Sequence, residues 1–144
     1  MSRWTHVNGI IRLWHIHLPG FRKPPRFKVI EREFKVSIPC GSEGPLAINV
    51  LRDYGGGDLN YAIVTITGDL RDYGEPQDIK NMIEWLKSTL ERLKERYRVF
   101  VWDVVLHIQD EYGTEVILFM DDDEKWQLYV HSRSEDYKEM EVTE

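Results

Sequence analysis

Cysteine and long apolar runs are scarce in this chain of 144 residues. Cys40 is the only cysteine, so no disulfide can form within the chain, as expected for a protein of a reducing compartment. The longest apolar runs, residues 99–102 and 116–120, are far shorter than the roughly eighteen residues of a membrane-spanning helix. Residues 1–6 lack the features of a signal peptide. We therefore expect a cytoplasmic protein without membrane association.

Known catalytic motifs are also missing. The sequence contains no Gly-x-Ser-x-Gly, His-Glu-x-x-His or Cys-x-x-Cys motif and no dinucleotide fingerprint. The glycines at residues 55–57 are followed neither by Lys-Ser/Thr nor by a predicted helix, so a hairpin tip explains them better than a phosphate loop. We expect no cofactor, and the sequence favours a non-enzymatic protein without deciding whether any activity exists.

The net charge of −6 is unevenly distributed. Residues 1–35 carry eight basic and two acidic side chains, whereas residues 36–144 carry eleven basic and twenty-three acidic ones. The basic segment either binds a polyanion or packs on acidic parts of the same chain. We favour the second interpretation, because an acidic body repels nucleic acid.

The clearest predicted element is an amphipathic helix over residues 76–97. Pro76 stands at the favoured first helical position. Apolar side chains then recur at spacings of three and four: Ile79, Ile83, Leu86, Leu90, Leu93 and Tyr97. Residues 27–38 fit either a helical face or an edge strand, and we favour a helix.

Several segments are predicted as strands: residues 4–18, 46–50, 61–67, 99–109, 115–120 and 126–131. In the fourth of these, alternation places Phe100, Trp102, Val104, Leu106 and Ile108 on one face. The element order predicts an α+β fold with a ferredoxin-like split βαββαβ antiparallel sheet, one long amphipathic helix and an extra C-terminal β-hairpin. Residues 1–131 are expected to form this single domain, and residues 132–144, with five acids, a flexible acidic tail.

A five-residue phrase, Leu-Arg-Asp-Tyr-Gly, occurs at residues 51–55 and again at residues 70–74. Each copy follows a predicted strand. In an antiparallel hairpin the copies would lie roughly 25–30 Å apart at about 3.3 Å per residue, so one chain cannot combine them into one site. They are best interpreted as strand terminators. As an alternative, arginine would pair with phosphate and tyrosine would stack on a base, which makes these residues candidates for a small-ligand or nucleotide site: Arg52, Asp53, Tyr54, Arg71, Asp72 and Tyr73.

Tryptophan and tyrosine are abundant, with five and seven copies. Trp85 lies off the helical stripe and Trp126 follows a turn, so neither is placed for an obvious core role. Such side chains anchor protein interfaces. The paired aromatic and basic signature of RNA-binding ferredoxin-like sheets is absent, so the expected partner is a protein rather than a nucleic acid. A homo-oligomer stays open.

His15 and His17 are weak candidates for a metal site, because residues two apart on a strand project from one face. His107 or His131 on neighbouring strands would have to complete the site. This is the basis of a third hypothesis, a metal-dependent enzyme. The simpler interpretation is that these histidines occupy the face opposite Trp14, and no bound metal is expected.

The opening residues 4–12, the turn at residues 41–44 and the approach to the helix at residues 73–76, followed by Trp85, resemble small uncharacterised proteins encoded by bacteriophages. The resemblance implies a non-enzymatic binder of a host or phage protein in the host cytoplasm, including inhibitors of host defence systems. It supplies no catalytic motif.

Overall fold

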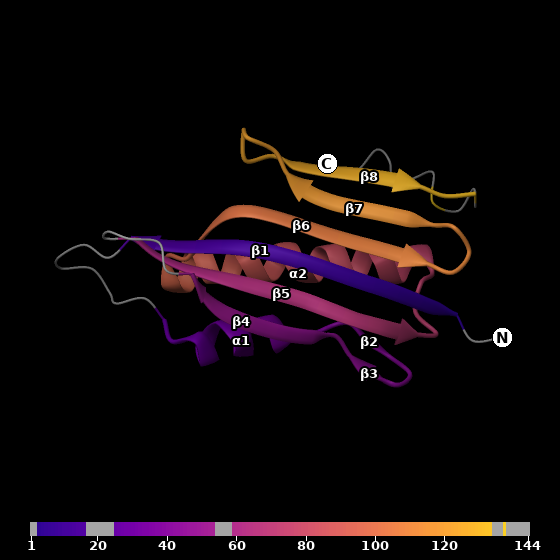
Figure 1. The fold of residues 1–144 in the computed structure, drawn as a ribbon, viewed down its shortest axis with the longest axis horizontal. Coiled ribbons are helices and arrows are strands. Elements are labelled where there is room, and N and C mark those ends of the chain that lie inside the picture. The colour runs from indigo at the N-terminus through magenta and orange to yellow at the C-terminus, as the bar shows by residue number, and fades with distance from the viewer. Residues whose placement is uncertain (1–2, 17–24, 54–58, 134–136, 138–144) are drawn as a thin grey trace.

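The fold of the chain is an α+β arrangement of two helices and a six-stranded sheet, seen in a computed structural model that describes residues 3–16, 25–53, 59–133 and 137 (Figure 1). The helices are α1 (Phe27–Lys35) and α2 (Pro76–Tyr97). The large sheet contains β1 (Trp4–Ile16), β4 (Ala47–Asp53), β5 (Leu59–Arg71), β6 (Phe100–Asp110), β7 (Glu115–Met120) and β8 (Trp126–His131). A separate small hairpin consists of β2 (Cys40–Gly41) and β3 (Gly44–Pro45).

The large sheet has the strand order β4-β5-β1-β6-β7-β8, and every neighbouring pair is antiparallel. Strand β1 lies between β5 and β6. It pairs with β5 along its whole length, from Trp4 opposite Arg71 to Ile16 opposite Leu59. Since the first strand of the chain pairs with elements far along the sequence, the centre of the sheet is held by long-range contacts.

Helix α2 has the predicted bounds and the predicted buried stripe. Pro76 occupies the first turn, and the side chains of Glu75 and Asp78 form a reciprocal capping box with the backbone. Arg98 ends the helix in a left-handed conformation, with φ of 53°. The stripe residues Ile79, Leu86 and Leu93 are nearly inaccessible, which confirms the periodicity.

Residues 27–35 are a helix, so the preferred prediction for this segment is confirmed and the alternative of an edge strand is wrong. Ile30 and Phe34, one turn apart, are both buried. Helix α1 contacts β4 and α2. It therefore widens the helical layer beyond the long helix.

The helical layer covers one face of the sheet only. Helix α2 crosses behind β1, β5 and β6, while β7 and β8 lie to one side of it (Figure 1). Odd-numbered residues of β1 from Thr5 to Leu13 and even-numbered residues of β5 face the helices, as in Ile11, Val64 and Ile66, and they are buried. The opposite face of the sheet has no helix among the described residues, and we call it the open face.

The prediction that Trp102 shares a face with Val104 is wrong. The pairing of β1 with β6 shifts register between Arg12 and Leu13, which face Asp103 and Val101 and leave Trp102 as an extra residue. The side-chain alternation of β6 reverses at this bulge. Val104, Leu106 and Ile108 are buried, but Trp102 is 55% exposed.

Tyr137 lies within residues 132–144, the segment predicted as an acidic tail. Tyr137 is 2% exposed, and its hydroxyl donates a hydrogen bond to the Gly74 carbonyl. The neighbouring residues 134–136 and 138–144 lie outside the described part of the chain. Neither helix in the described ranges has the length and apolar character that a bilayer-spanning helix requires.

Candidate functional site

The open face of the sheet carries large apolar side chains that no described element covers. Five of them are about half exposed: Ile10 57%, Leu51 54%, Trp102 55%, Val105 49% and Tyr129 51%. They come from four of the six strands, namely β1, β4, β6 and β8, so the apolar character extends across the face. Ile10 and Val105 are directly opposite each other, and Val105 is opposite Phe119. An extended exposed apolar surface of this kind is typical of an interaction site.

The charged groups of the open face pair with one another. Arg12 lies 3.8 Å from Asp103, His6 lies 2.5 Å from Asp69, and His107 lies 3.2 Å from Glu115. Each pair joins neighbouring strands. These contacts give polar groups of the face partners within the sheet, which lowers the cost of covering them with an apolar partner.

An aromatic cluster marks one end of the open face. The rings of Trp102 and Tyr61 meet edge to face, with centroids 5.6 Å apart. The Arg12 guanidinium lies 5.9 Å from the centroid of the Trp102 ring. The bulge in β6 is what projects Trp102 into this position, because a regular strand would turn it towards the helices.

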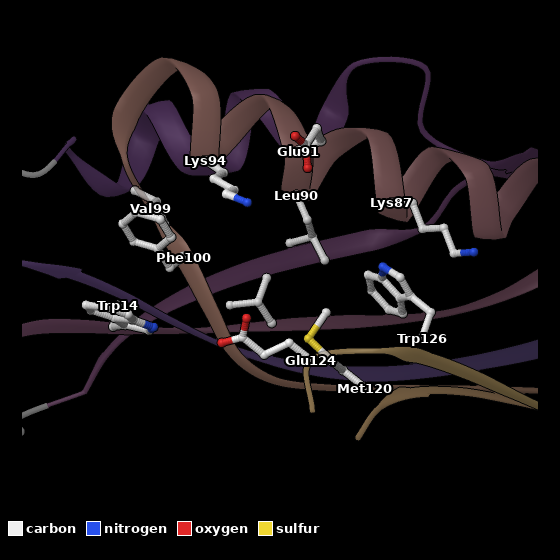
Figure 2. Close-up of a pocket in the computed structure, with 11 residues that line it drawn as sticks. Trp14, Lys87, Leu90, Glu91, Lys94, Val99, Phe100, Met120, Glu124 and Trp126 are labelled. Carbon is white, nitrogen blue, oxygen red and sulfur yellow. The ribbon is translucent and has the colours of Figure 1, made fainter. Parts of the chain in front are cut away.

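A second feature is a groove on the helical side, between α2 and the ends of β6, β7 and β8. Figure 2 shows Lys87 and Leu90 reaching from α2 towards Trp126 and Met120 on the sheet. The Lys87 ammonium lies 5.6 Å from the centroid of the Trp126 ring. The groove holds about 220 Å³. Its lining is Trp14, Lys87, Leu90, Glu91, Lys94, Val99, Phe100, Val101, Met120, Glu124 and Trp126.

This groove is poorly suited to enclosing a nucleotide or a substrate. Ligand pockets usually hold roughly 300–1,000 Å³, more than this groove offers. Its two lysines are balanced by Glu91 and Glu124, so no concentrated positive charge is available for a phosphate. Trp126, predicted as an exposed anchor, is half-buried under Lys87.

The structure places the two copies of Leu-Arg-Asp-Tyr-Gly at opposite ends of the hairpin β4–β5. Asp53 is opposite Tyr61, whereas Arg71 is opposite Trp4. Residues 61 and 71 are ten positions apart on one strand, or about 33 Å at roughly 3.3 Å per residue. The prediction that one chain cannot combine the copies is confirmed. Arg52 lies in β4 beside Asp53, and Tyr54 lies outside the described residues.

The second copy makes contacts within the chain. Arg71 pairs with Glu43 at 2.8 Å, and Asp72 accepts a hydrogen bond from the Ser42 hydroxyl at 2.9 Å. The Tyr73 hydroxyl donates to the backbone carbonyl of Asp78 at 2.7 Å, and burial raises the pKa of this tyrosine above its ordinary value. These contacts attach the β2–β3 hairpin and the start of α2 to the end of β5, which agrees with a terminator role.

A buried polar network adjoins this end of β5. Arg3 pairs with Asp110 at 2.5 Å and also donates to the Tyr137 hydroxyl at 3.3 Å. The Asp110 carboxylate accepts two further hydrogen bonds, from the backbone N–H groups of Tyr112 and Thr114. Burial raises the pKa of Tyr137 to about 12. Sequence analysis missed this network, because Arg3 is more than a hundred residues from Asp110 and from Tyr137 along the chain.

Trp85 belongs to the core. It was predicted to bind a partner because it lies off the helical stripe, but this position is buried and not exposed. The side chain is 7% exposed, and its indole N–H donates to the Phe34 carbonyl at 3.0 Å. The Trp85 and Phe34 rings meet edge to face, with centroids 6.2 Å apart. Helix α1 packs on the side of α2 and so buries a position off the main stripe.

The predicted metal site cannot be completed as proposed. His15 is 4% exposed and lies with the residues of β1 that face the helices, whereas His107 is opposite Asn8 on the open face. His131, opposite Glu115, lies on the open face too. His17 falls outside the described residues. Within the described ranges no group of three or more His, Cys, Asp or Glu residues could hold a metal ion.

No family model matches this chain, and neither a curated protein nor a solved structure is significantly similar to it.

Proposed function

We propose that this chain is a non-enzymatic interaction protein that binds a partner protein through the open face of its sheet. The observation that carries the proposal is the set of half-exposed apolar side chains on the face opposite the helices, with Ile10 and Val105 at its centre. Aromatic and aliphatic side chains of this size dominate the energy of protein interfaces. The proposed occupant is a partner that presents apolar side chains to this centre.

The charges of the face support a protein rather than a nucleic acid as the partner. The register assigns two arginines to the described open face, and both pair with carboxylates: Arg12 with Asp103 at 3.8 Å and Arg71 with Glu43 at 2.8 Å. A nucleic-acid site needs several lysines or arginines aimed at phosphates. The carboxylates of the face would instead repel the phosphate backbone.

The finer parts of the proposal concern the sheet topology, the origin and the location of the protein. The order β4-β5-β1-β6 with α1 and α2 on one side is the pattern expected of a ferredoxin-like sheet, which β7 and β8 would extend as a C-terminal hairpin. A phage origin and an action against a host defence system are supported by the sequence resemblance alone. A cytoplasmic location is supported by the single cysteine, Cys40.

The test is a binding measurement on a charged variant of the open face. A partner is first captured with the tagged protein from cells of its native host and then purified. Val105→Glu is expected to weaken binding of that purified partner by tenfold or more, because it buries a carboxylate in an apolar contact. Ser88→Glu on the exposed side of α2 is the matched control and is expected to leave the affinity unchanged.

Three outcomes would overturn this function. The first is equal affinity of the purified partner for the wild type and for folded Val105→Glu. The second is turnover of a nucleotide or phosphoester that is lost in Asp72→Ala. The third is conversion of a wild-type dimer into a monomer by Val105→Glu, which would assign the open face to a second copy of the chain.

A further inference from the structure

The two edges of the large sheet are protected differently. At the β4 edge, helix α1 contacts β4, and the β2–β3 hairpin contacts β5 where that strand extends past β4. The Ser42 N–H donates to the Arg71 carbonyl at 2.9 Å, so this hairpin takes up a backbone group of β5. Strand β8 forms the other edge, and no strand in the described part of the chain pairs with its outer side.

The outer edge of β8 offers a regular row of backbone hydrogen-bonding groups. The Asp121 N–H donates to the Lys125 carbonyl, which makes these two residues a hydrogen-bonded pair at the start of the β7–β8 ladder. Such pairs alternate along an antiparallel ladder. Counting from Lys125, the backbone N–H and C=O groups that point away from β7 are those of Trp126, Leu128 and Val130.

The sequence of β8 lacks the residues that commonly prevent an edge strand from pairing with a strand of another molecule. Its six residues, Trp-Gln-Leu-Tyr-Val-His, include no proline, lysine, arginine or acid. Natural edge strands are commonly blocked by such residues, by a bulge or by a covering element. The edge of β8 is therefore a template for another strand.

We propose that β8 pairs antiparallel with β8 of a second copy of this chain, around a two-fold axis through Leu128. Leu128 then lies opposite Leu128 of the second copy, and Trp126 lies opposite Val130. All of these residues have outward backbone groups, and their side chains lie on the helical face, where Val130 is buried and the other two are half-buried. The two six-stranded sheets become one continuous sheet.

Charge complementarity selects a second copy and this register. The turn before β8 contains Asp122, Asp123 and Glu124, and Arg133 follows its end. Antiparallel pairing brings the acidic end of each strand to the basic end of the other. With the axis at Leu128, the turn of one copy, which carries Asp123, lies beside Arg133 of the other. A shift of the axis to Tyr129 would instead place Lys125 opposite Arg133, which is unfavourable.

The first test combines a mass measurement with cross-linking. Light scattering is expected to give twice the chain mass of 17.1 kDa, with dissociation on dilution. In a Cys40→Ser background, Leu128→Cys is expected to form an intermolecular disulfide, because opposite residues in a hydrogen-bonded pair lie within the usual disulfide range. Tyr129→Cys is the control and is expected to stay reduced. Cross-linking of Tyr129→Cys alone would overturn the register, and a monomeric mass without cross-linking would overturn the dimer.

The second test exchanges charges across the axis. Asp123→Arg and Arg133→Glu each bring like charges close together at the two symmetric ends of the β8 pair and are expected to weaken the dimer by about tenfold. Mixing the two variants is expected to restore association, because each contact then joins opposite charges. Glu84→Arg, on the exposed side of α2, is the control for net charge. Failure of the mixture to regain the wild-type affinity would refute the proposed contact. Since these residues are outside the centre of the open face, this result is independent of the Val105→Glu test.

Discussion

The Tyr137 side chain is expected to anchor the residues after β8, and its removal gives a quantitative test. Its hydroxyl donates to the carbonyl of Gly74, a buried residue, and accepts from Arg3. Tyr137→Phe keeps the ring but leaves this carbonyl without its donor. Loss of a partner for a buried polar group costs about 1–3 kcal/mol. Tyr137→Ala also removes a ring that is 2% exposed and should cost about 3–5 kcal/mol in total.

Urea unfolding followed by circular dichroism measures both losses. For a chain of this size the dependence on urea is about 1–3 kcal/mol per molar, so Tyr137→Phe should lower the midpoint by about 1 M. Tyr129→Phe is the matched control, because its side chain is 51% exposed and its change should stay within about 0.5 kcal/mol. If Tyr137→Phe and Tyr129→Phe unfold at the same urea concentration, the anchoring role of Tyr137 is refuted.

Three further predictions concern groups in the folded core. Burial raises the pKa of Tyr137 from its ordinary value of 10.0 to about 12. The neutral side chain therefore stabilises the fold fully below pH 10, and this stabilisation is lost as the pH rises to 12. The difference between the urea midpoints at about pH 9 and about pH 11.5 should be smaller in Tyr137→Phe than in the wild type. Trp85→Phe should cost about 1–3 kcal/mol in urea unfolding, since the Phe34 carbonyl loses its donor, and an unchanged midpoint would contradict the core role of the indole. Glu33→Gln should cost about 2–3 kcal/mol, because the buried carboxylate pairs with Arg92 at 3.2 Å; a cost below about 0.5 kcal/mol would show that this pair contributes little.

Local elements were predictable because their signals lie in short stretches of sequence. The proline at its start and the stripe from Ile79 to Tyr97 predicted the position and the approximate length of α2. The segments 115–120 and 126–131 also agree with the bounds of β7 and β8. Periodicity and turn residues act within a few positions of the chain, so the sequence alone carries this information.

The candidate site depended on contacts that periodicity does not encode. Alternation in β6 predicted Trp102 on the same face as Val104, but pairing with β1 introduced a bulge that turned it outward beside Tyr61. Trp85 was predicted to be available for a partner, but α1 covers it. In both cases the exposure of a tryptophan was decided by a strand or helix distant in sequence.

The sequence by itself determined that this chain forms an α+β domain with a long amphipathic helix, since local propensity and hydrophobic spacing suffice for that. Only the tertiary structure decided which face of the sheet stays uncovered, which edge strand lacks protection, and that Tyr137 returns to the buried network of Arg3 and Asp110. The physical reason is that burial is a property of packed layers. A side chain becomes core or surface according to what is placed above it, and in this fold those neighbours come from remote parts of the chain.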